Sequence, residues 1–509
     1  MKKIRFVTKS NTSVFYSDPF FALLLVCTFL FSTYNLAYSQ TTHSHAHSYA
    51  QTDGQPNIHS SSDTLLHTHP HPHSHDHSRA HAIEDISHTH THLKVDYSFQ
   101  KDAGHYEPPV PDDDGYFWWK GNLHTHTLWS DGDQFPEIVT QWYYEHGYHF
   151  LSLSDHNILS RGEKWVQPGG GKDVYELYRK RFGDDWVETR EDNGQMEIRL
   201  KPLNEVRALF EKSGRFIMIE SEEITEREHI VHVNATNILD LIEPQTGASV
   251  EETIRLNIDA VVEQSNRTGQ EMIPHLNHPN FRTAVTAEDM APVENMRLFE
   301  VYNGHRGVVN FGDDDGTKDL DRVWDIVLTR RLGELNLGLL YGVATDDAHN
   351  YEPGTSERSV PGRGWVRVRT QFLTPEHIVR ALENGDFYSS TGVTINSVEA
   401  DESSYIVEIE PEDGVDYTIQ FIGTRRGYDS KSEHFVDSEG QARHDRTRRY
   451  SGDIGEILEE VSGTEAQYQF RGDELYVRAK VISSKPKENY FAEGEREKAW
   501  LQPVQVTHN

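Results

Sequence analysis

From about residue 116 to residue 392, short apolar runs alternate with stretches whose apolar residues recur at helical spacing. This alternation of strands and helices predicts a mainly parallel sheet, and seven or eight such units predict a closed barrel. The expected helices are PEIVTQWYYEHG from Pro136, NEVRALFEKSG ending at Gly214, EETIRLNIDAVVEQSNRTG over 251–269, DLDRVWDIVLTRR from Asp319 and TPEHIVRALENG over 374–385.

Two regions depart from this alternation. Residues 159–202, with GGGK at Gly169, are too long for a plain loop and predict an insertion over the mouth of the barrel, a candidate substrate lid. After residue 392, apolar and polar residues alternate in YIVEIEP, YTIQFIG, AQYQFRG and LYVRAKVIS. This period of two predicts a small antiparallel β-sandwich domain over 393–509 with a structural or docking role.

Residues 1–39 have the pattern of a secretory signal peptide, with a basic start and an apolar core from Phe20 to Phe31. We therefore expect export to the periplasm or the extracellular space. Cys27 lies in this core, so the exported chain would have no cysteine and no disulfide. A lipid anchor on Cys27 is the alternative, but Val26 fits it poorly.

Residues 40–115 show no sustained periodicity, and 14 of the chain's 30 histidines fall between His43 and His92. Such a tract cannot bury enough apolar surface to fold alone, so it predicts a disordered, His-rich linker. Two interpretations stay open for it: a low-affinity collector of zinc or a similar ion, and a solvated spacer.

The net charge is -33, and it becomes -36 without residues 1–39, which contribute +3 through Lys2, Lys3, Arg5, Lys9 and Asp18. So acidic a surface argues against nucleic acid and against anionic membranes as partners, because both require a cationic face.

Seven of the apolar runs end in histidine or an acid. They are KGNLHTHTLWSDG (His124, His126, Asp131), FLSLSDHN (Asp155, His156), FIMIESEEIT (Glu220, Glu222, Glu223), HIVHVNATNI (His229, His232), MIPHLNHPN (His275, His278), LFEVYNGH (Glu300, His305) and LYGVATDDAHN (Asp346, Asp347, His349). Because the carboxyl ends of barrel strands meet on one face, we expect these side chains to converge. Imidazole together with carboxylate suits zinc, manganese or iron, so the pattern predicts a metal site.

HTHTLWSDG, SDHN, EEIT, HVN, NHPN and DDAHN, in this order, resemble the motif series of the PHP (polymerase and histidinol phosphatase) superfamily of metal-dependent hydrolases. The resemblance covers about residues 116–392 and implies an α/β fold, a distorted seven-stranded (β/α) barrel with two or three divalent ions. RALENGDFYSSTG from Arg380 and AWLQPV from Ala499 resemble, more loosely, the closing segments of exported members grouped with carbamate-ester hydrolases.

The resemblance also implies a ligand set. The first ion would be bound by His124, His126, Glu223 and Asp347, and Glu223 would bridge to a second ion bound by His232 and His278. A third ion would lie between His156, His349 and Asp131, although many three-ion members have a histidine at the position of Asp131.

Nearby alternatives exist for three of these ligands: Glu220 or Glu222 for Glu223, His229 for His232, and His275 for His278. Glu223 is preferred because it alone is followed by Ile-Thr in the family manner. Asp155 is expected to orient a histidine rather than to bind metal.

The expected activity is hydrolysis of a phosphoester by a metal-bound hydroxide, because two neighbouring ions lower the pKa of a shared water. No Ser-His-Asp order or reactive cysteine offers another nucleophile. His349 or Asp131 would relay protons. Arg282, ahead of Arg306 and Arg161, would bind phosphate oxygens. Trp129, Trp165 and Tyr302 are candidates either for an apolar pocket wall or for the core.

Two other functions stay open: hydrolysis of a carboxyl or carbamate ester on the same metal centre, and non-catalytic metal binding or storage, which the His-rich tract favours. For an enzyme, the expected partner is a small-molecule ester, with no nucleic acid and no membrane after signal cleavage.

Overall fold

The computed structural model describes residues 108–167, 172–351 and 358–507, all within one compact unit of the chain. The expected signal peptide and residues 40–107 of the expected linker lie outside the described residues. None of the described helices is long and apolar enough to span a membrane. The division into domains at residue 392 stays a prediction.

The helices and strands alternate at first, and strands dominate after α7. The helices are α1 (Pro136–Glu145), α2 (Lys172–Phe182), α3 (Leu203–Phe210), α4 (Val250–Thr268), α5 (Ala287–Met290), α6 (Leu320–Gly333) and α7 (Pro375–Asn384). The strands up to α7 are β1 (Phe117–Asn122), β2 (Phe150–Leu153), β3 (Lys164–Val166), β4 (Thr189–Asp192), β5 (Gln195–Leu200), β6 (Ile217–Thr225), β7 (His232–Thr236), β8 (Ile273–Leu276), β9 (Leu298–Asn303), β10 (Tyr341–Thr345) and β11 (Trp365–Thr370). The later strands are β12 (Phe387–Ser390), β13 (Ile395–Ala400), β14 (Ser404–Ile409), β15 (Tyr417–Arg425), β16 (Ser432–Glu433), β17 (Phe435–Val436), β18 (Ala442–Arg443), β19 (Arg449–Tyr450), β20 (Glu456–Ser462), β21 (Glu465–Gln469), β22 (Glu474–Pro486) and β23 (Arg496–Gln505).

The five helices expected from the sequence are confirmed, and capping residues fix several of their ends. The Ser249 side chain accepts a hydrogen bond from the Glu252 amide at the start of α4, and Gly269 ends this helix with a φ of 73°. One boundary was wrong. α3 ends at Phe210 instead of continuing to Gly214, because Lys212 and Phe216 pair as a β-bridge around that glycine.

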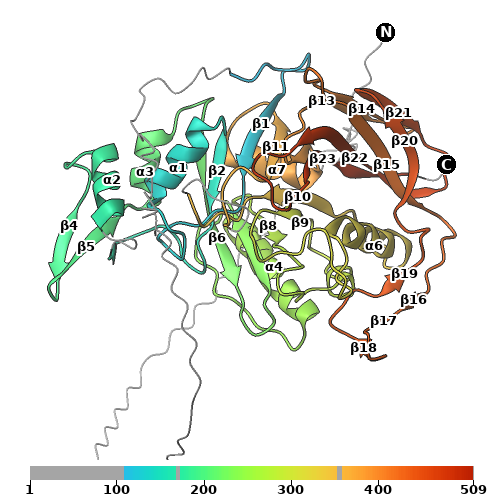
Figure 1. Cartoon of the computed structure of the whole chain (residues 1–509), viewed down its shortest axis with the longest axis horizontal. Helices are drawn as coiled ribbons and strands as arrows, with labels where there is room; N and C mark the ends of the chain where they lie inside the picture. Colours follow the sequence, from blue (N-terminus) through green and yellow to red (C-terminus); the bar gives the residue numbers. More distant parts are fainter. Residues whose placement is uncertain (1–107, 168–171, 352–357, 508–509) are drawn as a thin grey trace, which may run out of the picture. The chain divides into compact units, whose positions relative to one another are not determined.

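Thirteen strands form one mixed sheet, in the order β10-β9-β8-β7-β6-β2-β1-β11-β12-β23-β22-β15-β20 (Figure 1). β1, β2 and β6 are parallel neighbours, as are β8, β9 and β10. The expectation of parallel strands is wrong for β7, which runs antiparallel to β6 and to β8. The connection from β6 to β7 contains no helix, and so short a connection cannot return the chain to the start of a parallel strand.

The first seven strands of this order bring their two outer members together beyond the strand ends. Thr125 and Ala348 form a parallel bridge, and the Asp347 amide donates to the His124 carbonyl. Along β10 itself, side chains from the C-terminal strands cover the backbone. Gln502 bonds the amide and the carbonyl of Gly342 through its side chain.

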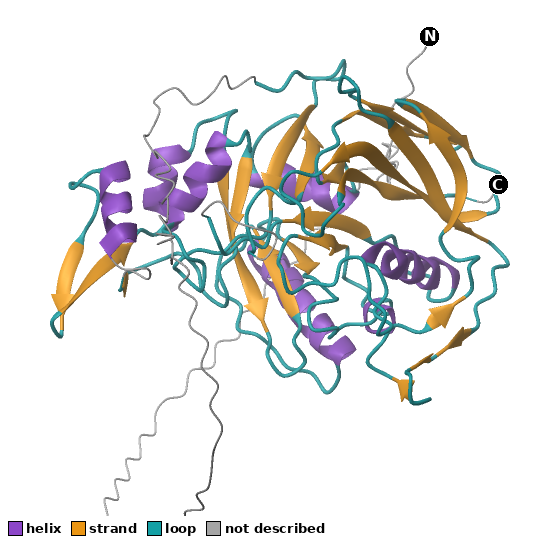
Figure 2. Cartoon of the chain, viewed as in Figure 1, coloured by secondary structure: helices purple, strands orange, loops and turns teal. Residues whose placement is uncertain are grey.

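The helices pack on the strands that carry the candidate site. α4 lies against β7 and β8, and α6 lies against β9 on one side and β22 on the other (Figures 1 and 2). The largest hydrophobic core joins them, with Ile254 and Ile258 of α4 and Val323 and Trp324 of α6 fully or almost fully buried. This packing holds the carboxyl ends of the strands in place.

Residues 159–202 contain a three-stranded antiparallel sheet in the order β3-β5-β4, together with α2. The hairpin of β4 and β5 points away from the large sheet (Figure 1). Tyr178 and Trp186 donate to the buried Glu137 carboxylate of α1, each at 2.7 Å. These contacts attach the insertion to α1, and a role as a substrate lid stays a prediction.

The strands after α7 form two layers. β13, β14 and β21 make a small antiparallel sheet, whose inner face shares a core with β15, β22 and β23 of the large sheet. Tyr405 and Val407 from the small sheet meet Phe421 and Val481 from the large one. Sheet-on-sheet packing of this kind is sandwich-like.

Candidate metal centre

The nine predicted ligands lie together at one end of the sheet, next to strand ends. His124 and His126 follow β1, with Asp131 in the loop after them; His156 follows β2, Glu223 lies near the end of β6, His278 follows β8, and Asp347 and His349 follow β10. His232 is the first residue of β7 rather than the last. Because β7 is antiparallel to its neighbours, its start lies beside the ends of β6 and β8.

Four buried side chains form the centre of this group. The Nε2 atoms of His124 and His126 face each other at 3.1 Å. Oδ1 of Asp347 lies 3.3 Å and 3.1 Å from these two nitrogens. Oε2 of Glu223 lies 3.5 Å and 3.4 Å from the same two atoms. Side chains from the segments after β1 and β10 and from the end of β6 thus converge on one point.

Glu223 lies between this group and a second one. Its other oxygen, Oε1, is 2.9 Å from Nδ1 of His232 and 3.4 Å from Nε2 of His278. The Asn277 side chain donates to the same oxygen at 2.8 Å. The carboxylate is therefore oriented so that Oε1 faces His232 and His278, whereas Oε2 faces His124, His126 and, at 2.7 Å, Nδ1 of His156.

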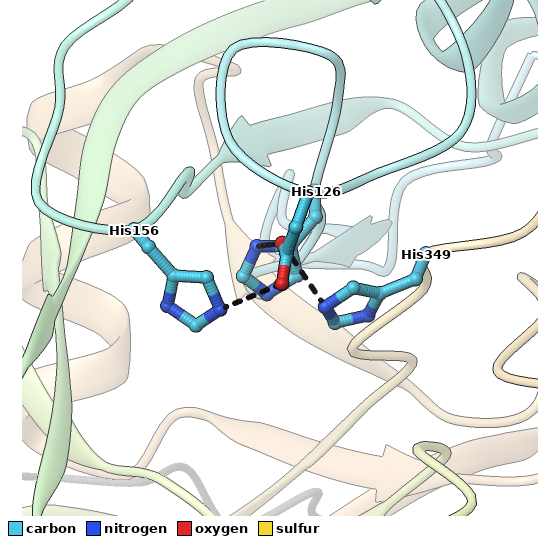
Figure 3. A group of neighbouring side chains, drawn as sticks. His126, His156 and His349 are labelled. Carbon is cyan, nitrogen blue, oxygen red and sulfur yellow. Dashed lines mark ion pairs between the residues drawn. The ribbon is translucent and has the colours of Figure 1, made fainter. Parts of the chain in front are cut away.

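A third group surrounds Asp131 at the outer edge of the centre. Its carboxylate lies 3.3 Å from Nε2 of His349, 3.6 Å from Nε2 of His156 and 3.7 Å from Nδ1 of His126. Figure 3 shows the three imidazoles pointing toward one another from separate segments of the chain. The Asp131 side chain is 57% exposed, whereas that of His126 is fully buried.

The residues present fit divalent cations. Among the described residues, five groups of histidine and acidic side chains could hold a metal ion, and four of them contain predicted ligands alone. Oε2 of Glu223 is buried and has no hydrogen-bond partner, although imidazole nitrogens surround it. Nitrogen and oxygen donors in this mixture suit zinc, manganese or iron.

The charges of the centre also favour a cation. Burial opposes ionisation of Glu223 and Asp347, but the nearby histidines outweigh it and hold the pKa of both carboxyls well below the usual range. Burial, together with His349 and His156, lowers the pKa of His126 to about 3. The acids are therefore charged and the imidazole of His126 is neutral, which is the state in which each can bind a metal ion. Burial opposes protonation of the other histidines, but the nearby acids raise the pKa of His124 and His349, and that of His156 to about 11, so a bound ion must displace their protons.

Strand geometry separates Glu223 from the alternatives Glu220 and Glu222. Successive residues of a strand point to opposite faces, so Glu222 lies on the face opposite to Glu223. Its carboxylate accepts a hydrogen bond from the Ile242 amide at 2.7 Å. Glu220 forms a two-point ion pair with Arg161 at 2.5 Å and 2.6 Å.

The histidine alternatives also lie apart from Glu223. His229 makes a hydrogen bond of 3.0 Å with the carbonyl of Gly247. His275 is fully buried, and its Nε2 lies 3.5 Å from Glu300. His232 and His278 are the ones that face Glu223.

Asp155 orients a loop directly, and it reaches a histidine only through Ser130, whose hydroxyl lies 3.4 Å from Nδ1 of His126. Its carboxylate accepts hydrogen bonds from the amide and hydroxyl of Thr127 and from the hydroxyl of Ser130, at 2.6–2.8 Å. These donors lie in the loop between His126 and Asp131, so Asp155 fixes the segment that presents Asp131.

Two ligands have left-handed backbone conformations. The φ of His278 is 22° and that of Asp347 is 47°, and Arg282 and Thr283, just after His278, also have positive φ values. Residues with side chains adopt this conformation at a cost, which surrounding contacts must offset. Both loops that complete the centre therefore carry backbone strain.

The arginines predicted to bind phosphate and the aromatic residues predicted to line the pocket lie in different parts of the structure. Arg161 is committed to Glu220. Arg282 is exposed and lies over the Phe281 ring, which is 5.1 Å from the ring of His278. Arg306 is also exposed. Of the aromatics, Trp129 and Tyr302 are buried in the core, and Trp165 lies on the insertion beneath Arg190.

Several residues that adjoin the centre were not among the predicted site residues: Asn277, Phe281, Glu300, Asn303, His305 and Thr345. Glu300 and His305 were visible as polar residues at the end of an apolar run, but nothing in that run distinguished a ligand from a neighbour. Burial lowers the pKa of His305 to about 4, and its Nδ1 accepts a hydrogen bond from the Gly307 amide.

Comparison with known proteins yields solved structures of low similarity. No protein-family model and no curated protein matches the chain. A two-domain protein from Bacteroides vulgatus, described as containing a predicted PHP-like metal-dependent phosphoesterase, is 16% identical over 78% of this chain and 99% of its own, with a TM-score of 0.36. A protein from Bifidobacterium adolescentis, provisionally described as a metal-dependent phosphoesterase, is 13% identical over 50% of this chain and 93% of its own, with a TM-score of 0.26. Because both TM-scores lie below 0.5, neither likeness assigns a family.

Proposed function

We propose that this chain is a metal-dependent hydrolase of the PHP superfamily that acts on a phosphoester. The observation that supports it best is the orientation of Glu223, with His124 and His126 on one side and His232 and His278 on the other. The motif resemblance requires a bridging carboxylate at this position. In this proposal, strands β10-β9-β8-β7-β6-β2-β1 correspond to the distorted barrel of the family.

The proposed centre has two main ion sites that share Glu223, and a third site among Asp131, His156 and His349. Bound divalent ions would lower the pKa of a water molecule and polarise the ester bond. The chain's own contribution is to orient the ligands and to exclude bulk water, since His124, His126, Glu223 and Asp347 are all buried.

Proton transfer and phosphate binding fall to residues at the outer edge. When the third site holds no ion, we assign proton exchange with the leaving group to His349 or Asp131, because their side chains are 17% and 57% exposed and lie 3.3 Å apart. Arg282 follows His278 by four residues and is exposed, so it is our candidate for contact with phosphate oxygens.

We also propose that the protein is exported and acts on a small-molecule ester. The signal-like pattern of residues 1–39 supports export, and the net charge of -33 disfavours nucleic acid and anionic membranes as partners.

The proposal is tested by assaying the full chain with p-nitrophenyl phosphate and bis(p-nitrophenyl) phosphate in added zinc or manganese. Wild-type protein should hydrolyse at least one of them, and His126→Ala should lose roughly 100-fold or more. Arg282→Ala should weaken turnover, whereas Arg190→Ala, on the insertion, should not. Equal turnover by wild type and His126→Ala would contradict the site assignment.

One observation keeps a carboxyl or carbamate ester as the second candidate. Within the described residues, every ion pair made by Asp131, Glu223 or Asp347 is to a histidine, with no arginine or lysine among the partners. A phosphomonoester dianion benefits from such cations, whereas a neutral ester does not need them. Turnover of p-nitrophenyl acetate without turnover of either phosphate, unchanged in Arg282→Ala, would favour this candidate.

A further inference from the structure

Glu300 of β9 is fully buried beside the proposed metal centre and accepts four hydrogen bonds. Its Oε1 bonds Nδ1 of His124 at 2.7 Å and the hydroxyl of Thr345 at 2.6 Å. Its Oε2 accepts from the backbone amide of His278 and from the Asn303 side chain, both at 2.7 Å. Both oxygens are therefore saturated with donors.

These donors connect Glu300 to three proposed ligands on three different strands or loops. His124 is contacted through its ring and His278 through its backbone. The third connection is indirect, because the Asn303 amide that donates to Glu300 also lies 3.1 Å from Oδ2 of Asp347. One carboxylate thus joins the segments after β1, β8 and β10.

We propose that Glu300 is the positioning residue of the metal centre: it fixes the orientation of His124 and the backbone of His278 so that ions bind tightly. The proposal rests on the metal centre proposed above. A hydrogen bond from Nδ1 of His124 to a carboxylate leaves the lone pair of Nε2 free, and Nε2 is the atom that faces His126, Glu223 and Asp347.

The contact with His278 has a second effect. With a φ of 22°, this residue has a backbone conformation that costs free energy, and it is held there by the hydrogen bond from its amide to Glu300. The same bond sets the direction in which the His278 side chain leaves the loop, toward Oε1 of Glu223.

Glu300 also belongs, with His124 and His275, to a group that could itself hold an ion. We assign it the positioning role because each oxygen already accepts two hydrogen bonds, so at least one of them would have to break before Glu300 could bind metal. Nδ1 of His124 would also have to turn from Glu300 to the ion, away from Glu223 and Asp347.

The decisive variant is Glu300→Gln, which keeps the shape but turns one oxygen into an amide. All four partners of Glu300 donate, so the amide must face two donors whichever way it turns. We expect the affinity for zinc and manganese to fall ~10- to 100-fold, the range found when a partner of a metal-binding histidine is removed. The measurement is a competition titration against a chromophoric chelator on the full chain, so that any ions bound by the His-rich tract contribute equally in every variant.

Glu222→Gln is the matched control. Glu222 is also a fully buried glutamate near a strand end, but it accepts a hydrogen bond from Ile242 and its other oxygen has no partner. The Glu222→Gln variant should bind metal with the same affinity as wild type. Thr345→Val provides a milder variant if Glu300→Gln does not fold. The Thr345 hydroxyl bonds Glu300, so any effect on metal affinity passes through that carboxylate; we expect a several-fold loss.

The outcomes separate the two proposals. If wild type binds no tight divalent ion, the proposed function fails. If wild type binds metal and a folded Glu300→Gln, or Thr345→Val in its place, binds it equally well, the metal centre stands and the positioning role of Glu300 is wrong.

Discussion

The proposed ligands differ in how firmly the surrounding chain holds them. His124, Glu223 and Asp347 are buried and bonded to neighbouring side chains. Asp131 has a mostly exposed side chain on a loop that is fixed through Thr127 and Ser130. An exposed carboxylate gains less from an ion than a buried one does, because water solvates it well. The site around Asp131 is therefore the weakest of the three.

Asp131→Ala should remove one ion per chain and leave the pair that shares Glu223. Glu223→Ala should remove at least two, because it deletes the bridging carboxylate. Metal content after dialysis, compared with wild-type full chain, gives the number lost. Loss of every ion in Asp131→Ala would show that the three sites do not form independently.

Glu222 is expected to make stability depend on pH. Burial raises the pKa of its carboxyl to about 8, so the folded chain retains a proton that the unfolded chain releases near its ordinary value. The retained proton contributes to the free energy of unfolding. This contribution is fully present at acid pH and is lost as the pH rises through 8. Unfolding free energies of wild type and Glu222→Gln, measured with chelator at pH 5 and pH 8, should diverge by a few kcal/mol, about 1.4 per pH unit at most. Parallel curves would contradict the raised pKa.

At the scale of elements, local sequence signals predicted the helices and their ends, but they did not predict the direction in which every strand pairs. The limits of α4 and α7 follow from Ser249, Thr374 and the glycines after each helix, which act within a few residues. The direction of β7 could not be predicted, because an apolar run ending in polar residues is the same in either direction. His232 of that run adjoins the centre although it lies at the start of β7 and not at its end.

The insertion shows the same limit. Its length indicated an extra element, but the hydrogen bonds from Tyr178 and Trp186 to Glu137 join residues that are 41 and 49 positions apart. No local pattern predicts such contacts. Three of the four donors around Glu300, from His124, His278 and Thr345, likewise come from other strands and loops, and only Asn303 lies in LFEVYNGH, so its role could not be predicted from that segment.

Tyr178→Phe should loosen the insertion without disturbing the metal centre. The substitution removes a hydrogen bond to a buried carboxylate, which is worth about 1–3 kcal/mol. Hydrogen exchange of residues 174–200 should become faster, whereas that of α4 should not change. Unchanged exchange in the insertion would mean that packing of the Tyr178 ring on Phe135 is sufficient to hold it.

At the scale of the whole molecule, the C-terminal strands complete the sheet that carries the site. Gln502 and Ser389 bond the backbone of Gly342 in β10. Arg478 of β22 forms a buried ion pair with Asp325 of α6 at 2.7 Å. These contacts cover an edge that would otherwise expose unpaired backbone groups. The structural role predicted for residues 393–509 is consistent with this packing.

Gln502→Ala should therefore destabilise the whole described unit rather than its C-terminal part alone. It leaves the Gly342 amide without its partner in a buried position, at a cost of about 2–4 kcal/mol. Denaturant unfolding followed by tryptophan fluorescence should show one transition shifted to lower denaturant. A second transition, with the first unchanged, would indicate that the two parts unfold independently.

The central claim is that His124, His126 and Asp347 share an ion with Glu223, which bridges to a second ion bound by His232 and His278. Anomalous diffraction at the zinc edge, on crystals of the full chain grown with zinc, tests it most directly. We predict two strong peaks on either side of the Glu223 carboxylate, and a weaker one beside Asp131. Strong peaks elsewhere on the described chain, with none within bonding distance of Glu223, would contradict the account.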